Sequence, residues 1–241
     1  MRTTLPWLRR ALRELGKELL DAVLPPACPA CREPGPGLCE RCRRALVVTP
    51  PGGCPRCGAP LGPDARCRES HDRVRHLRQV MAPFAFVGSG GVLVRRFKLD
   101  GDASAGRLLA RAMADTLRER LLPRGRVWLV PVPLHRARLR RRGFDQAAWL
   151  AREVGARAGV RVLEGVLQRR RATLPQGDPR VLSRVANVRG AFRLAAAAVV
   201  QRRDLVLIDD VFTTGATARA CAELLIAAGA RSVSLLTACR S

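Results

Sequence analysis

Residues 205–217, which read LVLIDDVFTTGAT, constrain the fold more than any other part of this sequence. The apolar residues predict a buried strand, and two adjacent carboxylates, Asp209 and Asp210, follow it directly. A short loop of small residues comes next and leads into a helical pattern. Ligands of α/β sheets bind beyond the carboxyl ends of the strands. We therefore expect the two acids and the loop to form a ligand site at that edge of the sheet.

This loop has the properties of a phosphate-binding turn. Its backbone N–H groups can point inward at the start of a helix, where the helix dipole favours an anion, and its glycine allows a positive φ. The loop residues assigned to the site are Thr213, Thr214, Gly215, Ala216 and Thr217. With the two acids as acceptors for a vicinal diol, the stretch predicts a cradle for a ribose 5-phosphate. It has neither the lysine of a nucleoside triphosphatase loop nor the spaced glycines of a dinucleotide fingerprint.

Clustered cysteines are the second strong constraint, since seven of the nine lie between positions 28 and 67. Two CxxC knuckles predict a closed tetrahedral Zn²⁺ site with the ligands Cys28, Cys31, Cys39 and Cys42. A third knuckle faces an incomplete partner, in which Ser70 stands where a thiol is expected. It predicts a second zinc site with the ligands Cys54, Cys57, Cys67 and His71. The alternatives are a redox dithiol for the first cluster and a degenerate ribbon held by packing for the second.

The order of elements predicts an α/β fold with a mainly parallel sheet. Apolar runs at 81–87, 127–132, 205–208 and 233–237 indicate strands, and they alternate with helical patterns near 90–98, 105–121, 144–158 and 217–228. We expect an amphipathic helix at 1–24, a cysteine-rich zinc ribbon at 25–78 and the α/β domain at 79–241.

Basic residues outnumber acidic ones by 44 to 20, which gives a net charge of +24. Such an excess predicts an anionic partner such as nucleic acid. All but two of the basic residues are Arg, a bias that a GC-rich coding sequence would also produce. The densest run, and the candidate contact for nucleic acid, comprises Arg136, Arg138, Arg140, Arg141 and Arg142. No apolar run approaches the ~18 residues of a membrane span, so we expect a cytoplasmic protein without stable membrane insertion.

Taken together, these motifs resemble a known family. The stretch 205–217 looks like the phosphoribosyl pyrophosphate (PRPP) signature of type I phosphoribosyltransferases. The order of the remaining motifs, FKLDGD at 97–102, PVPLH at 131–135 and RGFDQ at 142–146 after a cysteine-rich start, resembles the ComF family of competence-associated proteins. This resemblance implies a type I phosphoribosyltransferase-like sheet flanked by helices, preceded by a zinc ribbon. It also implies a role in the uptake of transforming DNA and binding of single-stranded DNA.

The resemblance further implies roles for individual residues. Pro131, Val132 and Pro133 would form a pyrophosphate loop, and Lys98 would also approach the pyrophosphate. A hood loop from about 169 to 187 would bring Arg171 and Arg184 over PRPP. Mg²⁺ would arrive with the pyrophosphate and ribose oxygens, in line with its preference for substrate oxygens. Asp145 departs from the family pattern, which has Asn at this place.

Three functions remain open at this point. The first is a PRPP-binding protein of DNA uptake that binds single-stranded DNA through its basic surface, with uptake or recombination proteins as further partners. The second is an active phosphoribosyltransferase with an unidentified acceptor. The third is a zinc-ribbon adaptor in which the phosphoribosyltransferase fold is vestigial.

Overall fold

The structure is a computed structural model that describes residues 26–50, 52–122, 125–171 and 190–241. The amphipathic helix expected at 1–24 lies outside these residues. Within the parts of the chain that are described, no helix combines the length and apolar character needed to cross a membrane.

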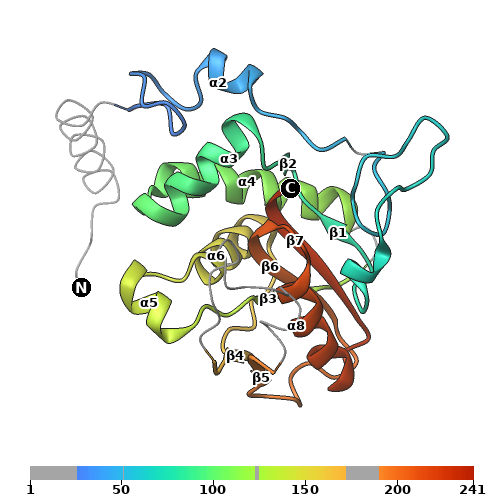
Figure 1. Cartoon of the computed structure of the whole chain (residues 1–241). Helices are drawn as coiled ribbons and strands as arrows, with labels where there is room; N and C mark the ends of the chain where they lie inside the picture. The colour runs from blue at the N-terminus through green and yellow to red at the C-terminus, as the bar shows by residue number, and fades with distance from the viewer. Residues whose placement is uncertain (1–25, 51, 123–124, 172–189) are drawn as a thin grey trace, which may run out of the picture.

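A parallel sheet forms the centre of the molecule, with its strands in the order β1–β7–β6–β3 and β2 also paired to β7 (Figure 1). Two long strands, β6 (Asp204–Phe212) and β7 (Ser232–Arg240), lie at its centre. The shorter strands around them are β1 (Val80–Met81), β2 (Phe84–Ala85) and β3 (Trp128–Pro131). The predicted mainly parallel sheet is confirmed.

Several strands differ from their expected lengths, among them β7, which continues past position 237 to Arg240. The apolar run at 81–87 forms two short strands, because Pro83 lies between β1 and β2 and has no backbone N–H to donate to a ladder. Strand β6 continues past position 208 to Phe212, since Asp209 pairs with Thr237 of β7. The two acids therefore lie within the last part of the strand rather than after it.

Helices cover both faces of the sheet. On one face lie α3 (Gly88–Arg95), a π-helical turn η2 (Arg96–Asp100), α4 (Ala103–Arg120) and α6 (Gln146–Ala158). The other face carries α8 (Ala216–Ala227) and the antiparallel hairpin of β4 (Leu167–Arg169) and β5 (Phe192–Leu194). Alternate side chains of β6 serve the two faces, as expected for a strand buried on both sides: Val206 and Ile208 face the first, and Leu205 and Leu207 the second.

The cysteine-rich segment packs against both faces. Its first part, with α2 (Glu40–Arg44), buries Cys28 and Cys42 in the same core as α3 and α4. Its second part, with the 3₁₀ turn η1 (His71–Val74), buries Cys54 and Cys57 in the core beneath α8. A segment with little apolar material thus gains stability from the sheet as well as from its own cysteines. The domain boundary expected near residue 79 stays a prediction.

Two helices in the described part of the chain were not expected, the short α2 and the longer α5 (Arg136–Arg142). The ring Nδ1 of His135 accepts a hydrogen bond from the backbone N–H of Ala137 at 3.2 Å and caps the start of α5, and Gly143 ends it with φ +78°. None of the residues of α5 is buried. Local caps rather than an apolar face therefore define this helix.

Candidate functional site

The acidic pair lies near the carboxyl end of β6 and is joined to the only lysine outside the N-terminal segment. Lys98 Nζ is 2.6 Å from Asp210 Oδ2, and the Asp210 carboxylate is buried. Lys98 comes from the π-helical turn η2, a rare element that is often found at functional sites. Lys98 is therefore in direct contact with one of the two acids, and its role toward a pyrophosphate stays a prediction.

Asp209 titrates differently from its neighbour. Burial, and next the negative charge of Asp210, raise the pKa of Asp209 to about 7, while Lys98 acts in the opposite direction. Two adjacent carboxylates that share one ammonium group cannot both ionise freely. Near neutral pH, the pair therefore offers hydrogen-bond acceptors and, on part of the Asp209 population, a donor as well. The acceptors and the donor could each form a hydrogen bond with a hydroxyl of a diol.

Gly215 shapes the loop between β6 and α8. It has φ +73° and lies at the N-cap of α8, where no side chain caps the helix. A Cβ at this position would overlap the carbonyl oxygen of Arg73 and would lie 3.0 Å from the Phe212 ring. The first amides of α8 have no partner within the helix, as at any helix start, and are available to an anion.

A small pocket lies inside this loop. Its walls come from the acidic strand, the loop, the start of α8 and the neighbouring strand, and they include Asp209, Thr213, Gly215, Thr217 and Thr237. The buried hydroxyl oxygen of Thr214 has no hydrogen-bond partner among the described residues. The structure thus brings Asp209 and most of the predicted loop residues together around one hollow, whereas Asp210 contacts Lys98 and does not line it.

The stretch 131–133 lies beside the end of β6 that carries the acids, and its role as a pyrophosphate loop stays a prediction. Pro131 ends β3 in register with Ile208, and the Val132 N–H donates to the Ile208 carbonyl oxygen at 2.9 Å. Asp145 supports the next residue: its Oδ2 accepts from the Leu134 N–H at 3.3 Å, and its Oδ1 accepts from the Ala148 N–H at 3.0 Å. A carboxylate is therefore a suitable replacement for the amide of Asn here, because both bonds need only an acceptor.

The hood residues are only partly described. Arg171 is exposed at the end of the described hairpin, and Arg184 lies outside the described residues. Sequence reasoning did not single out Arg169, on β4, which lies with its guanidinium carbon 5.3 Å from the centre of the Phe192 ring. Burial and then the charge of Arg138 lower the pKa of Arg169, and Asp209 opposes them. Arg169 is therefore close enough to Arg138 and to Asp209 for both charges to affect it, and the sequence alone does not show this proximity.

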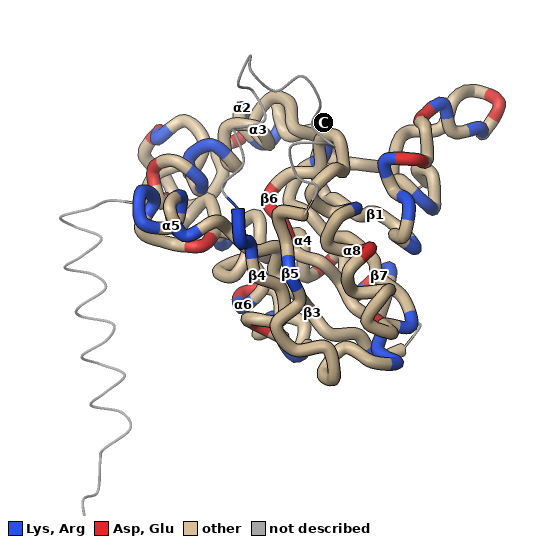
Figure 2. Tube along the Cα trace, turned by 60° about the horizontal axis from the view of Figure 1, so that its bottom comes forward, with Lys and Arg blue, Asp and Glu red and all other residues tan. Residues whose placement is uncertain are grey.

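The basic run predicted to contact nucleic acid forms helix α5. Figure 2 shows its arginines close to the basic residues of β4. Arg136, Arg140 and Arg141 are exposed, whereas Arg142 donates from Nη1 to Gln146 Oε1 at 3.1 Å. Burial, and next Arg142 and Arg141, lower the pKa of Arg138. Like charges therefore gather on one face of this helix.

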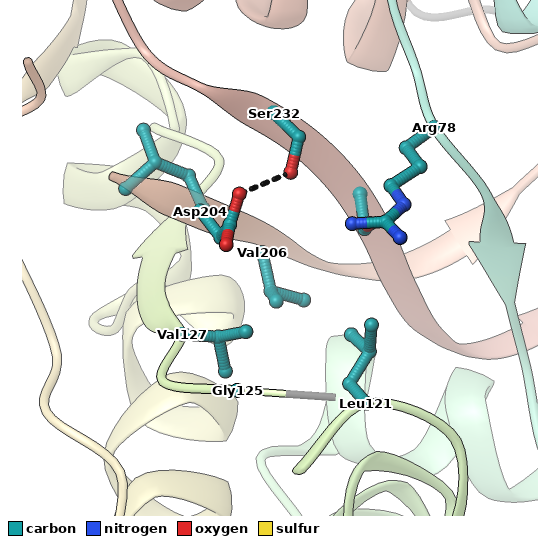
Figure 3. Close-up of a pocket in the computed structure, with 9 residues that line it drawn as sticks. Arg78, Leu121, Gly125, Val127, Asp204, Val206 and Ser232 are labelled. Carbon is teal, nitrogen blue, oxygen red and sulfur yellow. Dashed lines mark hydrogen bonds between the residues drawn. The ribbon is translucent and has the colours of Figure 1, made fainter. Parts of the chain in front are cut away.

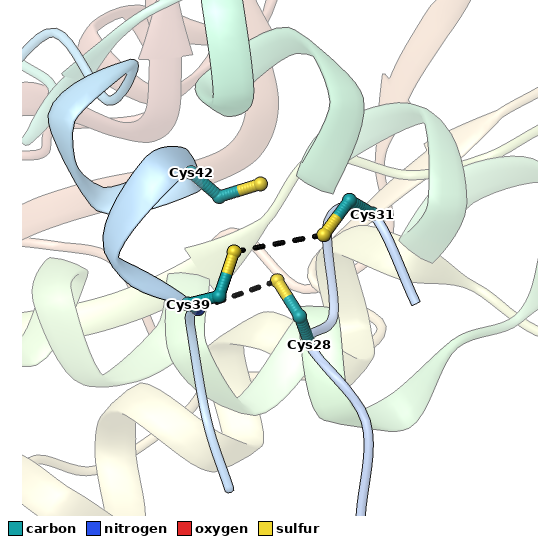
Figure 4. Close-up of side chains that lie close together, drawn as sticks. All are labelled: Cys28, Cys31, Cys39 and Cys42. Atoms are coloured by element: carbon teal, nitrogen blue, oxygen red, sulfur yellow. Dashed lines mark hydrogen bonds between the residues drawn. The ribbon is translucent and has the colours of Figure 1, made fainter. Parts of the chain in front are cut away.

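The first cysteine cluster has the geometry of a tetrahedral metal site. The four sulfur atoms lie within 4.8 Å of one another and point toward a common centre (Figure 4). Cys31 Sγ and Cys39 Sγ are 3.6 Å apart, close to the ~3.8 Å between thiolates that bind one zinc ion at ~2.3 Å. Burial opposes ionisation of Cys28, but backbone N–H groups, led by those of Cys31 and Cys39, lower its pKa to about 6. These residues fit Zn²⁺.

The second cluster fits zinc as well, with three thiols and one imidazole. Its ligand atoms also lie within 4.8 Å of one another. Cys57 Sγ is 3.5 Å from Cys67 Sγ, and Cys54 Sγ is 3.5 Å from His71 Nε2, close to the ~3.5 Å expected between sulfur and nitrogen ligands of zinc. His71 thus occupies the place of the missing thiol. The four ligand atoms are arranged as in a zinc site, which favours zinc binding over a degenerate ribbon held together by packing.

Another pocket lies at the opposite, amino end of the central strands (Figure 3). Its acid, Asp204, accepts from Ser232 Oγ at 2.7 Å and from Arg231 Nε at 2.9 Å. The Arg231 guanidinium holds the pKa of Asp204 below its usual value, against a smaller effect of burial. The carboxylate is occupied by these internal partners, so this pocket is not the site that the sequence predicted.

Known proteins resemble this chain along most of its length. Residues 19–71 match the family model of the double zinc ribbon domain. The DNA utilization protein YhgH of Salmonella typhi is 31% identical over 230 residues, which cover 91% of this chain and 99% of that protein. Competence protein F of Haemophilus influenzae is 28% identical over 209 residues, covering 82% and 87%. Competence protein ComFC of Bacillus subtilis is 29% identical over 217 residues, covering 87% and 86%.

Solved structures with a similar arrangement include phosphoribosyltransferases. Adenine phosphoribosyltransferase of Leishmania tarentolae is similar over 82% of this chain and 70% of its own, with 13% identity and a TM-score of 0.39. A hypoxanthine phosphoribosyltransferase of Staphylococcus aureus is similar over 54% and 62%, with 14% identity and a TM-score of 0.36. Likeness at this level says nothing about ligands or activity.

The mainly parallel sheet flanked by helices and the two cysteine clusters define an α/β protein with an N-terminal double zinc ribbon. The relatives are similar over both parts together. The chain belongs to the ComF family, which its motifs had indicated.

Proposed function

We propose that this protein binds PRPP, or a related ribose phosphate, at the carboxyl end of β6 and acts in DNA uptake in the cytoplasm. The observation that carries the proposal is the small pocket formed by Asp209, the loop around Gly215 and the start of α8, with the Lys98–Asp210 ion pair next to Asp209 on the same strand end. The names of the relatives, which refer to competence and DNA utilization, supply the biological context.

Each part of the pocket has a role in this proposal. The amides at the start of α8 and the threonine hydroxyls hold the 5-phosphate, because the helix dipole and the unpartnered amides favour an anion. Asp209 and Asp210 hold the ribose hydroxyls. Lys98, already 2.6 Å from Asp210, neutralises part of the charge and faces the pyrophosphate. Mg²⁺ enters with the substrate oxygens, since it keeps few protein ligands.

Single-stranded DNA is the second ligand in this proposal, and helix α5 is its contact. Arg141 and Arg142 follow Arg138 by three and four positions, so both lie on the same side of the helix as Arg138. These arginines repel one another, and bound phosphates would offset that repulsion by placing negative charge next to them. The chain has an aromatic content of only 4%, so we expect contacts with the DNA backbone rather than stacking of many bases.

Calorimetric titration tests the ribose-phosphate part of this function. We expect saturable binding of Mg·PRPP and weaker binding of Mg·pyrophosphate, which lacks the ribose that the acids would hold. Equal affinity for both would contradict the role of Asp209 and Asp210. Release of pyrophosphate from PRPP on addition of an acceptor would instead show an active phosphoribosyltransferase. Absence of any PRPP binding would favour the zinc-ribbon adaptor.

Salt dependence tests the DNA part. We expect the affinity for an unstructured oligonucleotide to fall steeply with salt, with a slope of about −0.7 per phosphate contacted. The triple variant Arg138→Gln/Arg141→Gln/Arg142→Gln should reduce that slope by about 2. A matched control removes the same charge from α4, where Arg107, Arg111 and Arg118 are exposed. Equal effects of the two triple variants would show that net charge, and not α5, determines binding.

A further inference from the structure

We infer that zinc in the second cluster positions the phosphate loop, so that loss of this zinc weakens binding of the ribose phosphate. The inference rests on the proposed ribose-phosphate site. It assigns the cluster of Cys54, Cys57, Cys67 and His71 a role at the ligand site, in addition to holding the ribbon together.

The contact between the two sites is a backbone contact. The Arg73 carbonyl oxygen of η1 lies against Gly215, so closely that no Cβ fits between them. Gly215 is the N-cap of α8 and carries the left-handed turn of the loop. Arg73 is two residues from the proposed ligand His71 within the same 3₁₀ turn. Any shift of this turn therefore acts directly on the loop that would hold the phosphate.

The two halves of the second cluster are anchored to different degrees. Cys54 and Cys57 are buried beneath α8, and the last strand holds their knuckle: Arg240 Nη1 donates to the Cys57 carbonyl oxygen at 3.1 Å. The Val80 N–H also donates to the Arg56 carbonyl oxygen, at 2.9 Å. This half is therefore part of the sheet's own core.

The other half has little hold besides its cysteine and histidine. No residue from 60 to 73 is buried, and Figure 1 shows this segment extending away from the sheet. Its ion pairs, such as that of Arg73 with Glu69, are exposed and contribute little. Zinc would join Cys67 and His71 to the anchored knuckle, and Val74 would then complete the attachment from its place in the core. The metal and the buried side chain of Val74 are thus the two links that hold η1 against Gly215, one at each end of the turn.

The first cluster offers a natural comparison. Its described connection to the ligand site runs through Arg32, which pairs with Asp102 at 3.2 Å next to the turn that carries Lys98. The Arg32 side chain is 57% exposed, so this ion pair is screened by solvent. We therefore expect the first zinc to affect the loop much less than the second.

Hydrogen exchange and zinc analysis test this inference without a ligand. The variants are Cys67→Ser and Cys31→Ser, each of which removes one half-buried ligand from one cluster, and His71→Cys, which restores four thiols. We expect Cys67→Ser to contain one zinc less and to exchange the amides of residues 219–222, the first turn of hydrogen-bonded amides in α8, about tenfold faster, because local opening becomes easier. Cys31→Ser should change these amides much less, and His71→Cys should match the wild type.

Binding supplies the second measurement. We expect Cys67→Ser to bind Mg·PRPP about tenfold more weakly, since small misplacements of positioning groups have effects of this size or larger. If Cys67→Ser does not fold, graded removal of zinc from the wild type by a chelator replaces it, with zinc content and exchange followed together. Loss of the second zinc without faster exchange at 219–222 would overturn the inference. Failure of the wild type to bind Mg·PRPP would overturn the proposed function instead, because the exchange result stands by itself.

Discussion

At the scale of single residues, Gly215 is needed for two reasons, its backbone conformation and the lack of room for a side chain. It adopts φ +73°, and its missing side chain leaves room for the Arg73 carbonyl oxygen. For most glycines with positive φ, only the first reason applies. Gly159, for example, has φ +70°, but no atom lies within 4 Å of the place that a Cβ would take. The two glycines therefore separate the cost of backbone conformation from the cost of a steric clash.

We predict that Gly215→Ala lowers the free energy of unfolding by more than Gly159→Ala does. A left-handed alanine alone costs about 1 kcal/mol, and the overlap at Gly215 should bring the total to roughly 2–4 kcal/mol. Urea denaturation of both variants measures the difference. Equal losses of stability would mean that η1 moves away without cost and that the contact with Arg73 is unimportant.

Asp209 should make stability depend on pH in a particular direction. Its pKa rises from 3.8 in the unfolded chain to about 7 in the folded protein, chiefly through burial. The folded state therefore binds the proton more tightly, and the stability that this provides below pH 3.8 is lost as the pH rises through 7. An Asn side chain at position 209 does not titrate, so it would remove this dependence of stability on pH.

We accordingly predict that Asp209→Asn gains stability relative to the wild type between pH 5 and 8, by an amount on the order of 1–3 kcal/mol. Asp204→Asn is the control, since Arg231 keeps the pKa of Asp204 below its usual value and its titration ends before pH 5. Chemical denaturation at four pH values measures both. A constant difference between Asp209→Asn and the wild type across this range would show that Asp209 stays ionised.

At the scale of elements, α5 is a helix whose sequence favours binding over stability. It buries no residue, and its arginines repel one another across i,i+3 and i,i+4 spacings. Its caps, His135 and Gly143, define where it begins and ends. Such an element is expected to become more stable when a polyanion binds.

We predict that Arg141→Gln leaves stability unchanged or raises it by up to about 0.5 kcal/mol, while it weakens binding of single-stranded DNA. The paired control is Arg118→Gln on α4, where Arg118 forms an ion pair with Asp115 at 3.1 Å. That variant should lose a little stability and retain its affinity for DNA. Thermal unfolding and fluorescence anisotropy provide the two readouts. Loss of stability in Arg141→Gln would mean that α5 is held by internal contacts.

At the scale of the whole molecule, the two cysteine clusters are joined to opposite faces of one sheet. Cys28 and Cys42 belong to one core, and Cys54 and Cys57 belong to the other. Removal of the metal should therefore loosen the sheet and not merely release the N-terminal segment.

We predict two zinc ions per chain and a single cooperative unfolding transition. Chelation should lower the midpoint by roughly 10 °C, because each kcal/mol shifts the midpoint of a chain of this length by about 2–4 °C. Mass spectrometry under native conditions and calorimetry measure both quantities. Two separate transitions, with the second unaffected by the chelator, would show that the ribbon and the sheet unfold independently.

The central elements were predictable because their signals are local. An apolar run followed by two acids and a glycine loop indicates a strand, a turn and a helix, and CxxC spacings indicate ligands of one metal. Helix α5 was missed because it has no buried face and hence no apolar periodicity. Caps alone are a weak signal in sequence.

Other features of the site depend on contacts between distant segments. The extension of β6 to Phe212 depends on pairing with β7, and the Lys98–Asp210 ion pair depends on the π-helical turn. The proximity of Arg169 to Arg138 and Asp209 depends on the hairpin. Asp145 did carry a local signal, an acid directly before a helix, and its second bond to Leu134 is visible only in the fold.

Binding of Mg·PRPP to the wild type and to Asp209→Asn/Asp210→Asn tests the central claim most directly. These substitutions keep the size of both side chains but remove their charge, including that of Asp210, which contacts Lys98. We predict saturable binding with one PRPP per wild-type chain, and a loss of affinity of at least about a hundredfold in the double variant, since charge-assisted hydrogen bonds are worth ~1.5–3 kcal/mol each. Equal binding to the two proteins would contradict the assignment of this site.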